Sequence, residues 1–165
     1  MAKTRLFNPI LVTSGVGEGP TELAAFDAAL FSAGIANYNL IPLSSVIPVG
    51  FKVARGKPPY NGDHYGDRLY VVLAQKRQSQ LGNVAAAGLG WMLTTDGGPS
   101  CGLFVEHEGG SAAWVGEHIR KSLTSMCEYR PEKFGRIHTQ VASVRCKGAP
   151  VCALVAAVYS AEGWE

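Results

Sequence analysis

The chain has 165 residues, of which 47% are hydrophobic and 17% are charged, and its formal net charge is +2. Such a sequence can bury a core, and its length fits one compact domain, so we treat residues 1–165 as a single domain. The small net charge, with basic residues scattered along the chain, argues against a nucleic-acid-binding protein. Low charge combined with 20 glycines suggests a surface partly covered by other subunits.

Nothing in the sequence predicts a membrane segment or a metal site. Uninterrupted apolar runs of about 18 residues, the length that would predict a membrane span, do not occur. Residues 1–9 lack the apolar stretch and cleavage site of a signal peptide. The four cysteines (Cys101, Cys127, Cys146 and Cys152) form no CxxC pair, which disfavours a zinc ribbon or a disulfide framework. We therefore expect a cytoplasmic protein with reduced thiols, no metal and no membrane contact.

The first third of the chain predicts a strand, a turn and a helix. The apolar run 9–13 predicts a short strand, and the glycine-rich run 14–19 predicts a turn. A helix follows at 21–31, which Pro20 opens and Gly34 closes. Large apolar side chains recur along one stripe of this helix, with Asp27 beside them: Leu23, Phe26, Leu30 and Phe31.

The rest of the chain alternates between strands and helices after a polar loop at 52–67. The expected elements are a strand at 68–75, a small-residue helix around 84–92, a strand at 101–108, a helix at 114–126 and strands near 136–146 and 151–160. The last two strands are expected to form a hairpin around residues 147–150. This order predicts an α+β fold or a layered α/β sandwich.

The glycines at the predicted turn invite comparison with a phosphate-binding loop. Gly15, Gly17 and Gly19 do not have the GxGxxG spacing, and no GK[ST] follows them. A tight connection between strand and helix explains them better, and a nucleotide-binding module remains the weaker alternative.

Two glutamates on the predicted strand at 101–108 are candidates for proton transfer. In a strand, Glu106 and Glu108 share a face with Phe104, whereas His107 takes the opposite face. A carboxylate that continues an apolar face suits a proton donor. The alternative is that the strand simply emerges into water, and the spacing by itself favours that alternative.

A pair of serines interrupts an otherwise apolar segment. Ser44 and Ser45 lie between Pro42 and Pro48, flanked by Leu43 on one side and by residues 46–47 on the other. Such a dipeptide is more often a solvated turn. Held in a stiff apolar segment, however, the hydroxyls and the peptide bond between them can be placed for an intramolecular attack.

Three blocks of the sequence together resemble the pyruvoyl-dependent arginine decarboxylases. The carrying blocks are ELAAFDAAL at 22–30, AGIANYNLIPLSSVIP at 33–48 and CGLFVEHEG at 101–109, and a C-terminal apolar strand that ends in Tyr159 adds to them. The resemblance is strongest over 13–48 and 100–110, and it is loose over 52–100. His107 departs from the family, which would have an aromatic residue there.

The resemblance implies a precursor that cuts itself between Ser44 and Ser45 into chains 1–44 and 45–165. Ser45 would become a covalently bound pyruvoyl group that forms an imine with L-arginine, and loss of CO₂ would leave agmatine. The protein would thus be a decarboxylase, a carbon–carbon lyase. The family also implies an αββα-layered sandwich, with cleaved protomers assembled as a homotrimer or a multiple of it, and active sites at subunit interfaces.

The same resemblance assigns roles to three further residues. Glu106 would return a proton to the substrate Cα, and Asn39 would contact the processing site, where its amide can donate to the developing oxyanion. Asp27 is the candidate for binding the guanidinium group, with a structural ion pair as an equal alternative. Two alternative functions are decarboxylation of another amino acid by the same chemistry and an unprocessed, inactive paralogue with a structural role.

Overall fold

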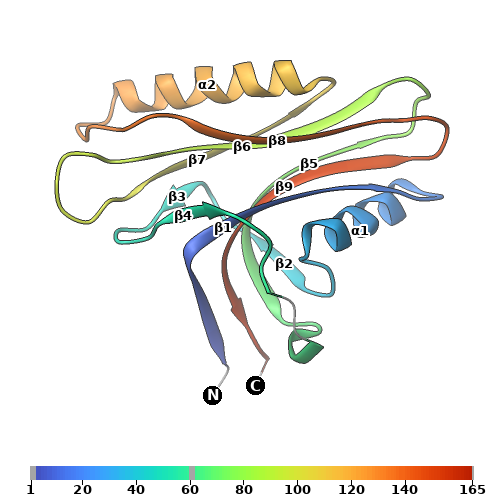
Figure 1. Cartoon of the computed structure of the whole chain (residues 1–165), viewed down its shortest axis with the longest axis horizontal. Coiled ribbons are helices and arrows are strands. Elements are labelled where there is room, and N and C mark those ends of the chain that lie inside the picture. The colour runs from blue at the N-terminus through green and yellow to red at the C-terminus, as the bar shows by residue number, and fades with distance from the viewer. Residues whose placement is uncertain (1–2, 60–61, 165) are drawn as a thin grey trace.

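The computed structural model describes residues 3–59 and 62–164 (Figure 1). In chain order the elements are β1 (Thr4–Glu18), α1 (Glu22–Ala33), β2 (Asn39–Pro42), β3 (Val46–Ile47), β4 (Val53–Arg55), the 3₁₀ turn η1 (Gly62–His64), β5 (Arg68–Gln78), β6 (Val84–Leu93), β7 (Gly102–Gly109), α2 (Ala112–Glu128), β8 (His138–Arg145) and β9 (Val151–Glu162). The two ends of the chain lie side by side, because Thr4 of β1 pairs with Glu162 of β9.

Two sheets are stacked between two helices. One sheet has the strand order β2-β5-β9-β1-β4 and the other β3-β7-β6-β8. The apolar core between the sheets includes Val12 and Val155 of the first sheet and Leu89 and Phe104 of the second. Helix α1 packs on the outer face of the first sheet and α2 on the outer face of the second (Figure 1). The fold is therefore α+β with two sheets and two helices, compatible with the predicted αββα sandwich.

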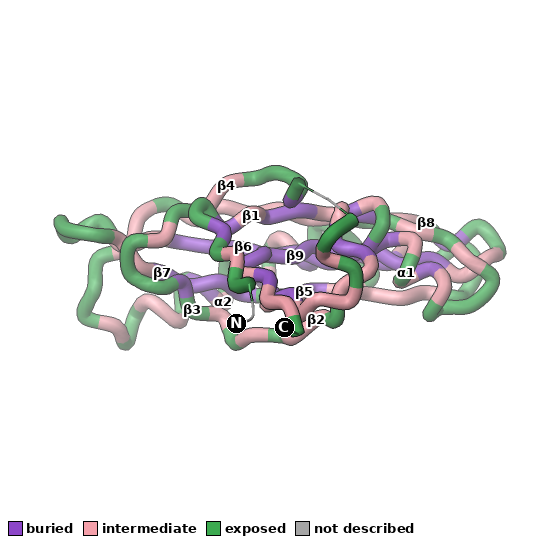
Figure 2. The backbone as a smooth tube through the Cα atoms, turned by 90° about the horizontal axis from the view of Figure 1, so that it is seen from below, coloured by how far each residue is buried: buried purple, intermediate pink, exposed green. Residues whose placement is uncertain are grey.

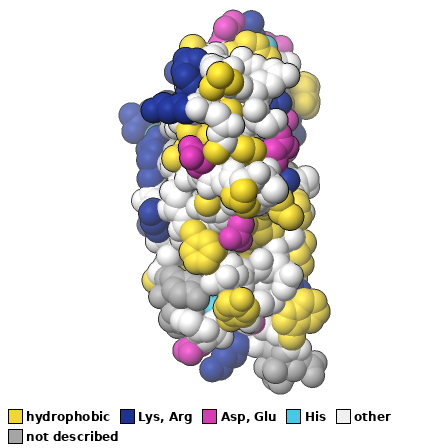
Figure 3. Space-filling view, turned by 90° about the vertical axis from the view of Figure 1, so that its right-hand side faces the viewer, with side chains coloured by type: hydrophobic (Ala, Val, Ile, Leu, Met, Phe, Trp, Pro, Cys, Tyr) yellow, Lys and Arg dark blue, Asp and Glu magenta, His cyan; other side chains and the backbone are white. Residues whose placement is uncertain are grey.

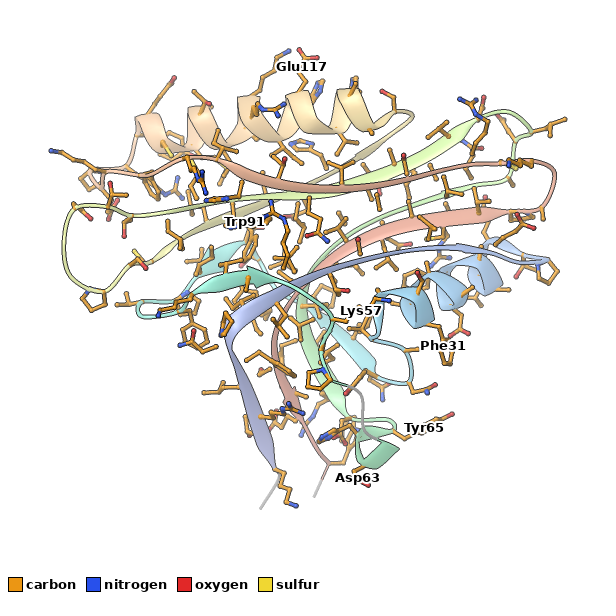
Figure 4. All side chains as sticks on the ribbon, in the orientation of Figure 1. Phe31, Lys57, Asp63, Tyr65, Trp91 and Glu117 are labelled. Atoms are coloured by element: carbon orange, nitrogen blue, oxygen red, sulfur yellow. The ribbon has the colours of Figure 1, made fainter. Side chains whose placement is uncertain are left out.

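Burial follows this layering. The buried stretches run along the central strands, β9 and β1 of one sheet and β6 of the other, while the loops at both ends are exposed (Figure 2). Trp91 of β6 lies in the layer between the sheets (Figure 4). Along these buried stretches the central strands are thus covered on both faces.

The predicted turn at 14–19 is wrong, because β1 continues to Glu18. Glycine is needed there because α1 lies directly on the strand. A Cβ on Gly17 would stand 2.4 Å from the carbonyl oxygen of Ala25, far inside van der Waals contact. The predicted helix is confirmed at 22–33, and Gly34 closes it at φ 77°. Pro20 does not open it, because the N-cap is Thr21, whose side chain accepts the Ala24 N–H. The nucleotide-binding alternative loses the loop on which it depended.

The small-residue helix predicted around 84–92 is also wrong, because this segment is strand β6. Alanine and glycine were misleading because alanine favours helices in the absence of packing information. In the fold, the small residues let α2 approach the sheet closely. A Cβ on Gly90 would stand 2.1 Å from Cγ2 of Ile119.

The predicted C-terminal hairpin is wrong as well. Both strands exist, but β8 pairs with β6 in one sheet, whereas β9 pairs with β5 and β1 in the other. The segment 146–150 therefore carries the chain from one sheet to the other.

Only part of the predicted apolar stripe of α1 is buried. The buried residues of the helix are Ala25, Ala29, Leu30 and Ala33, so Leu30 is the stripe residue among them. Leu23 is 67% exposed and Phe31 is 59% exposed, and Phe31 points away from the sheet (Figure 4). Hydrophobic side chains also reach the surface on the side of the molecule shown in Figure 3.

Candidate functional site

The two serines lie where the chain crosses from one sheet to the other. Strand β2 pairs with β5 at an edge of the five-stranded sheet, and β3 pairs with β7 at an edge of the four-stranded sheet. Before the crossing, the Leu43 N–H donates to the carbonyl of Val71 at 2.8 Å. Ser44 is exposed and Ser45 is half-buried. The peptide bond between them thus bridges two rigid layers.

Glu106 contacts Ser45 directly. The Ser45 hydroxyl donates to Glu106 Oε2 at 2.7 Å, and the Phe104 N–H donates to the Ser45 carbonyl at 2.8 Å. Phe104 is fully buried between the sheets, and Glu106 follows it on the same face of β7. This agrees with the face predicted for Glu106 from the sequence. The carboxylate is exposed, yet the strand does not simply lead it into water.

Tyr159, at the end of the apolar run in β9, completes the surroundings of Ser45. Its hydroxyl donates to the carbonyl of Val46 at 2.9 Å, and its ring lies 6.1 Å from that of Phe104. Burial, and then the nearby Glu106 carboxylate, raise the pKa of Tyr159 far above its ordinary value, so the phenol remains a donor. Sequence reasoning assigned Tyr159 no role, although a polar aromatic residue closing a buried strand was the available signal.

A groove of about 260 Å³ opens beside Glu106, between one strand of each sheet. Its lining residues are Leu73, Ala74 and Gln75 of β5 and Glu106, His107 and Glu108 of β7. Glu106 therefore lies between the Ser45 hydroxyl and a space that a small molecule can enter. Carboxylates on one wall of this groove suit a cationic ligand.

Two other predicted residues lie elsewhere in the chain. The Asn39 side-chain amide donates to the carbonyl of Gly66 at 2.7 Å. Asp27 is exposed on α1, where it forms no ion pair within the described ranges. The structure of one chain thus brings Ser44, Ser45 and Glu106 together, and it does not bring Asn39 or Asp27 to them.

His107 faces away from Ser45 and fixes β7 to α2. One of its ring nitrogens, Nε2, lies 2.7 Å from the Ser122 hydroxyl, and its ring meets the stacked rings of Trp114 and His118 edge-on. Burial, and secondarily the charge of His118, lower the pKa of His107, whereas Glu106 acts in the opposite direction. This residue supports the strand that carries Glu106.

Within residues 3–59 and 62–164, no group of three or more His, Cys, Asp or Glu side chains is placed to hold a metal ion. Neither helix in the described part of the chain is long and apolar enough to cross a membrane.

Comparison with known proteins decides the family. The family model described as pyruvoyl-dependent arginine decarboxylase matches residues 9–163, which include the serine pair and Glu106. The chain belongs to this family. A pyruvoyl-dependent arginine decarboxylase of Thermococcus sibiricus is 31% identical over 149 residues, 90% of this chain and 92% of the relative. The arginine decarboxylase 2 of Archaeoglobus fulgidus is 27% identical over 150 residues, 91% of this chain and 94% of the relative.

A higher identity is found over a shorter stretch. The Halobacterium salinarum pyruvoyl-dependent arginine decarboxylase is 43% identical over 97 residues, 59% of this chain. The chain spans 58% of the length of that relative, and 48% of the Thermoplasma volcanium one.

Proposed function

We propose that the protein is a pyruvoyl-dependent arginine decarboxylase, a carbon–carbon lyase that converts L-arginine to agmatine and CO₂. The observation that carries the proposal is the 2.7 Å hydrogen bond from the Ser45 hydroxyl to Glu106, which lines a groove between the sheets. Family membership over residues 9–163 supports it, as do the names of the relatives.

The residues around Ser45 fit a pyruvoyl group made from Ser45 itself. The backbone carbonyl of Ser45 already accepts the Phe104 N–H at 2.8 Å, and its side chain contacts Glu106, which lines the groove. Conversion of this serine needs no new space, because the group has fewer atoms than the side chain and amino group it replaces. When formed, the group supplies an electron-withdrawing carbonyl that eases the loss of CO₂ from an amino acid.

Self-cleavage makes that group available. The Ser45 hydroxyl would attack the carbonyl carbon of Ser44, so that the amide becomes an ester. Elimination would then release residues 1–44 with a carboxylate end and leave dehydroalanine at position 45, and water would hydrolyse this residue to the pyruvoyl group and ammonia. Two strands paired to different sheets, β2 and β3, hold the two sides of this bond. Because each side is anchored, the attacking oxygen and the carbonyl are kept close.

Glu106 is proposed as the acid that returns a proton to the substrate Cα after CO₂ has left. Its position next to residue 45, on the wall of the groove, supports this role. Its neighbour Glu108, on the same face, adds negative charge to the groove that a basic amino acid enters.

In this proposal the cleaved protomers form a homotrimer or a multiple of it. Asn39 acts earlier, at the processing site of the assembled precursor, and Asp27 binds the guanidinium group of arginine after cleavage. The exposed Leu23 and Phe31 on either side of Asp27 support an interface at this helix, since large apolar side chains are usually covered. A subunit interface there can place Asp27 at the groove of a neighbouring chain.

Release of CO₂ from single amino acids tests the substrate. Fully cleaved protein is incubated with arginine, lysine, ornithine, histidine and aspartate in separate reactions. We expect arginine to be the preferred substrate, because its planar guanidinium donates two parallel hydrogen bonds to a carboxylate. A cleaved enzyme that releases no CO₂ from arginine would overturn the assignment.

A further inference from the structure

The peptide segment to be cut forms a three-residue turn centred on Ser45. The Val46 N–H donates to the carbonyl oxygen of Ser44 at 3.1 Å, the hydrogen bond of a γ-turn. That oxygen belongs to the bond that self-cleavage breaks. We infer that the Val46 N–H is the donor that stabilises the oxyanion of self-cleavage, and that Tyr159 is a positioning residue for it; this inference rests on the proposed cleavage.

The step needs a donor at this atom. As the Ser45 Oγ bonds to the Ser44 carbon, the electron pair of the carbonyl moves onto its oxygen, which becomes an oxyanion. The C–N bond to Ser45 then breaks, the carbonyl re-forms as an ester, and the hydroxyl proton ends on the nitrogen of residue 45. The Val46 N–H already points at the oxygen on which the charge develops. A donor placed in advance stabilises that charge without reorganisation.

Two hydrogen bonds hold the Val46 N–H in this direction. The Ser45 carbonyl and the Val46 N–H belong to one planar trans peptide unit and point in opposite directions. The Phe104 N–H binds that carbonyl from β7 at 2.8 Å, so the N–H is turned toward Ser44. The Tyr159 hydroxyl binds the next carbonyl, that of Val46, at 2.9 Å. Both peptide units that flank Val46 are therefore fixed from the sheets.

Tyr159 is well suited to this role. It is 7% exposed, it reaches Val46 from the other sheet, and its phenol stays protonated. Within one chain the Asn39 amide donates to the carbonyl of Gly66, and the Val46 N–H is the donor that the same chain already places at the Ser44 oxygen.

The test follows self-cleavage by intact mass in precursor made by cell-free synthesis, for wild type, Tyr159→Phe and Tyr70→Phe. Tyr70 is the matched control, because its hydroxyl also donates a hydrogen bond, to Glu162 at 2.8 Å. We expect Tyr159→Phe to cleave roughly tenfold more slowly, the rate equivalent of one hydrogen bond, and Tyr70→Phe to cleave at the wild-type rate. Thermal unfolding of both variants is measured alongside, and we expect equal midpoints, which would exclude lost stability as the cause of the difference.

A second pair of variants addresses the N–H itself. Val46→Pro removes the donor and is expected to slow cleavage by about 10²–10³-fold, whereas Val46→Ala keeps the N–H and should cleave faster than Val46→Pro. If Val46→Pro does not fold, the Tyr159→Phe comparison decides. Wild type that cleaves beside an equally fast Tyr159→Phe would overturn this inference alone. A wild-type precursor that stays whole would overturn the proposed function, and this inference with it.

Discussion

Replacement of Glu106 by glutamine separates self-cleavage from turnover. The Ser45 hydroxyl donates to Glu106 Oε2 at 2.7 Å, and the glutamine oxygen can accept the same hydrogen bond. We therefore expect Glu106→Gln to cut itself at the Ser44–Ser45 bond. The amide has no proton to transfer to the substrate Cα, so arginine decarboxylation should fall by roughly 10²-fold or more, a barrier higher by about 2.7 kcal/mol or more.

The assay pairs intact-mass analysis with CO₂ release from arginine on the same preparation. Glu117→Gln is the control, because Glu117 pairs with Lys121 at 2.7 Å on the outer side of α2, away from the sheets (Figure 4). It should cleave and turn over as wild type does. Near-normal decarboxylation by fully cleaved Glu106→Gln would refute the role of Glu106 as the acid. A variant that stays whole would show that the carboxylate is needed earlier, for processing.

Three more predictions concern binding, packing and pH. Asp27→Asn should raise the KM for arginine and leave cleavage intact. An unchanged KM would contradict substrate binding by Asp27 and favour a structural role. Gly17→Ala should lower the free energy of unfolding by about 3 kcal/mol in denaturant titration, because a Cβ there meets the α1 backbone, whereas Gly62→Ala, in open space, should cost little. Because burial lowers the pKa of His107, the unfolded chain takes up its proton first, so the thermal midpoint should fall as the pH drops below about 6.5. His107→Phe should weaken that fall, and an unchanged pH dependence would contradict the reasoning.

Local sequence signals predicted the elements that depend on local chemistry. The end of helix α1 was predicted well because Gly34 terminates the helix whatever packs around it, whereas its opening was assigned to Pro20 and not to the N-cap Thr21. The segment 84–93 was predicted wrongly because its small residues make room for α2, which packs closely on this strand. That tertiary contact cannot be seen in the local sequence. The placement of β8 and β9 in different sheets also depends on contacts with distant strands. A short connection between two strands by itself predicts a hairpin, so the local sequence was misleading here.

The site shows the same division. The two-residue period of a strand predicted that Glu106 lies on the same face as the buried Phe104. In the structure, Glu106 on that face accepts a hydrogen bond from Ser45. Nothing in the spacing of residues shows that Ser45 and Glu106, 61 positions apart, form a hydrogen bond. The resemblance to a family supplied that link. Neither source predicted Tyr159 as a contact of the serine segment, because its partner is a backbone carbonyl on another sheet.

Intact-mass analysis of the purified protein tests the central claim most directly. Self-cleavage at Ser44–Ser45 predicts two chains, 1–44 and 45–165, of which the larger has a pyruvoyl group and no free amino terminus. Ser45→Ala should remain one uncut chain, because it lacks the attacking oxygen. A wild-type protein found only as one uncut chain, or a Ser45→Ala protein that splits into the same two pieces, would contradict the account.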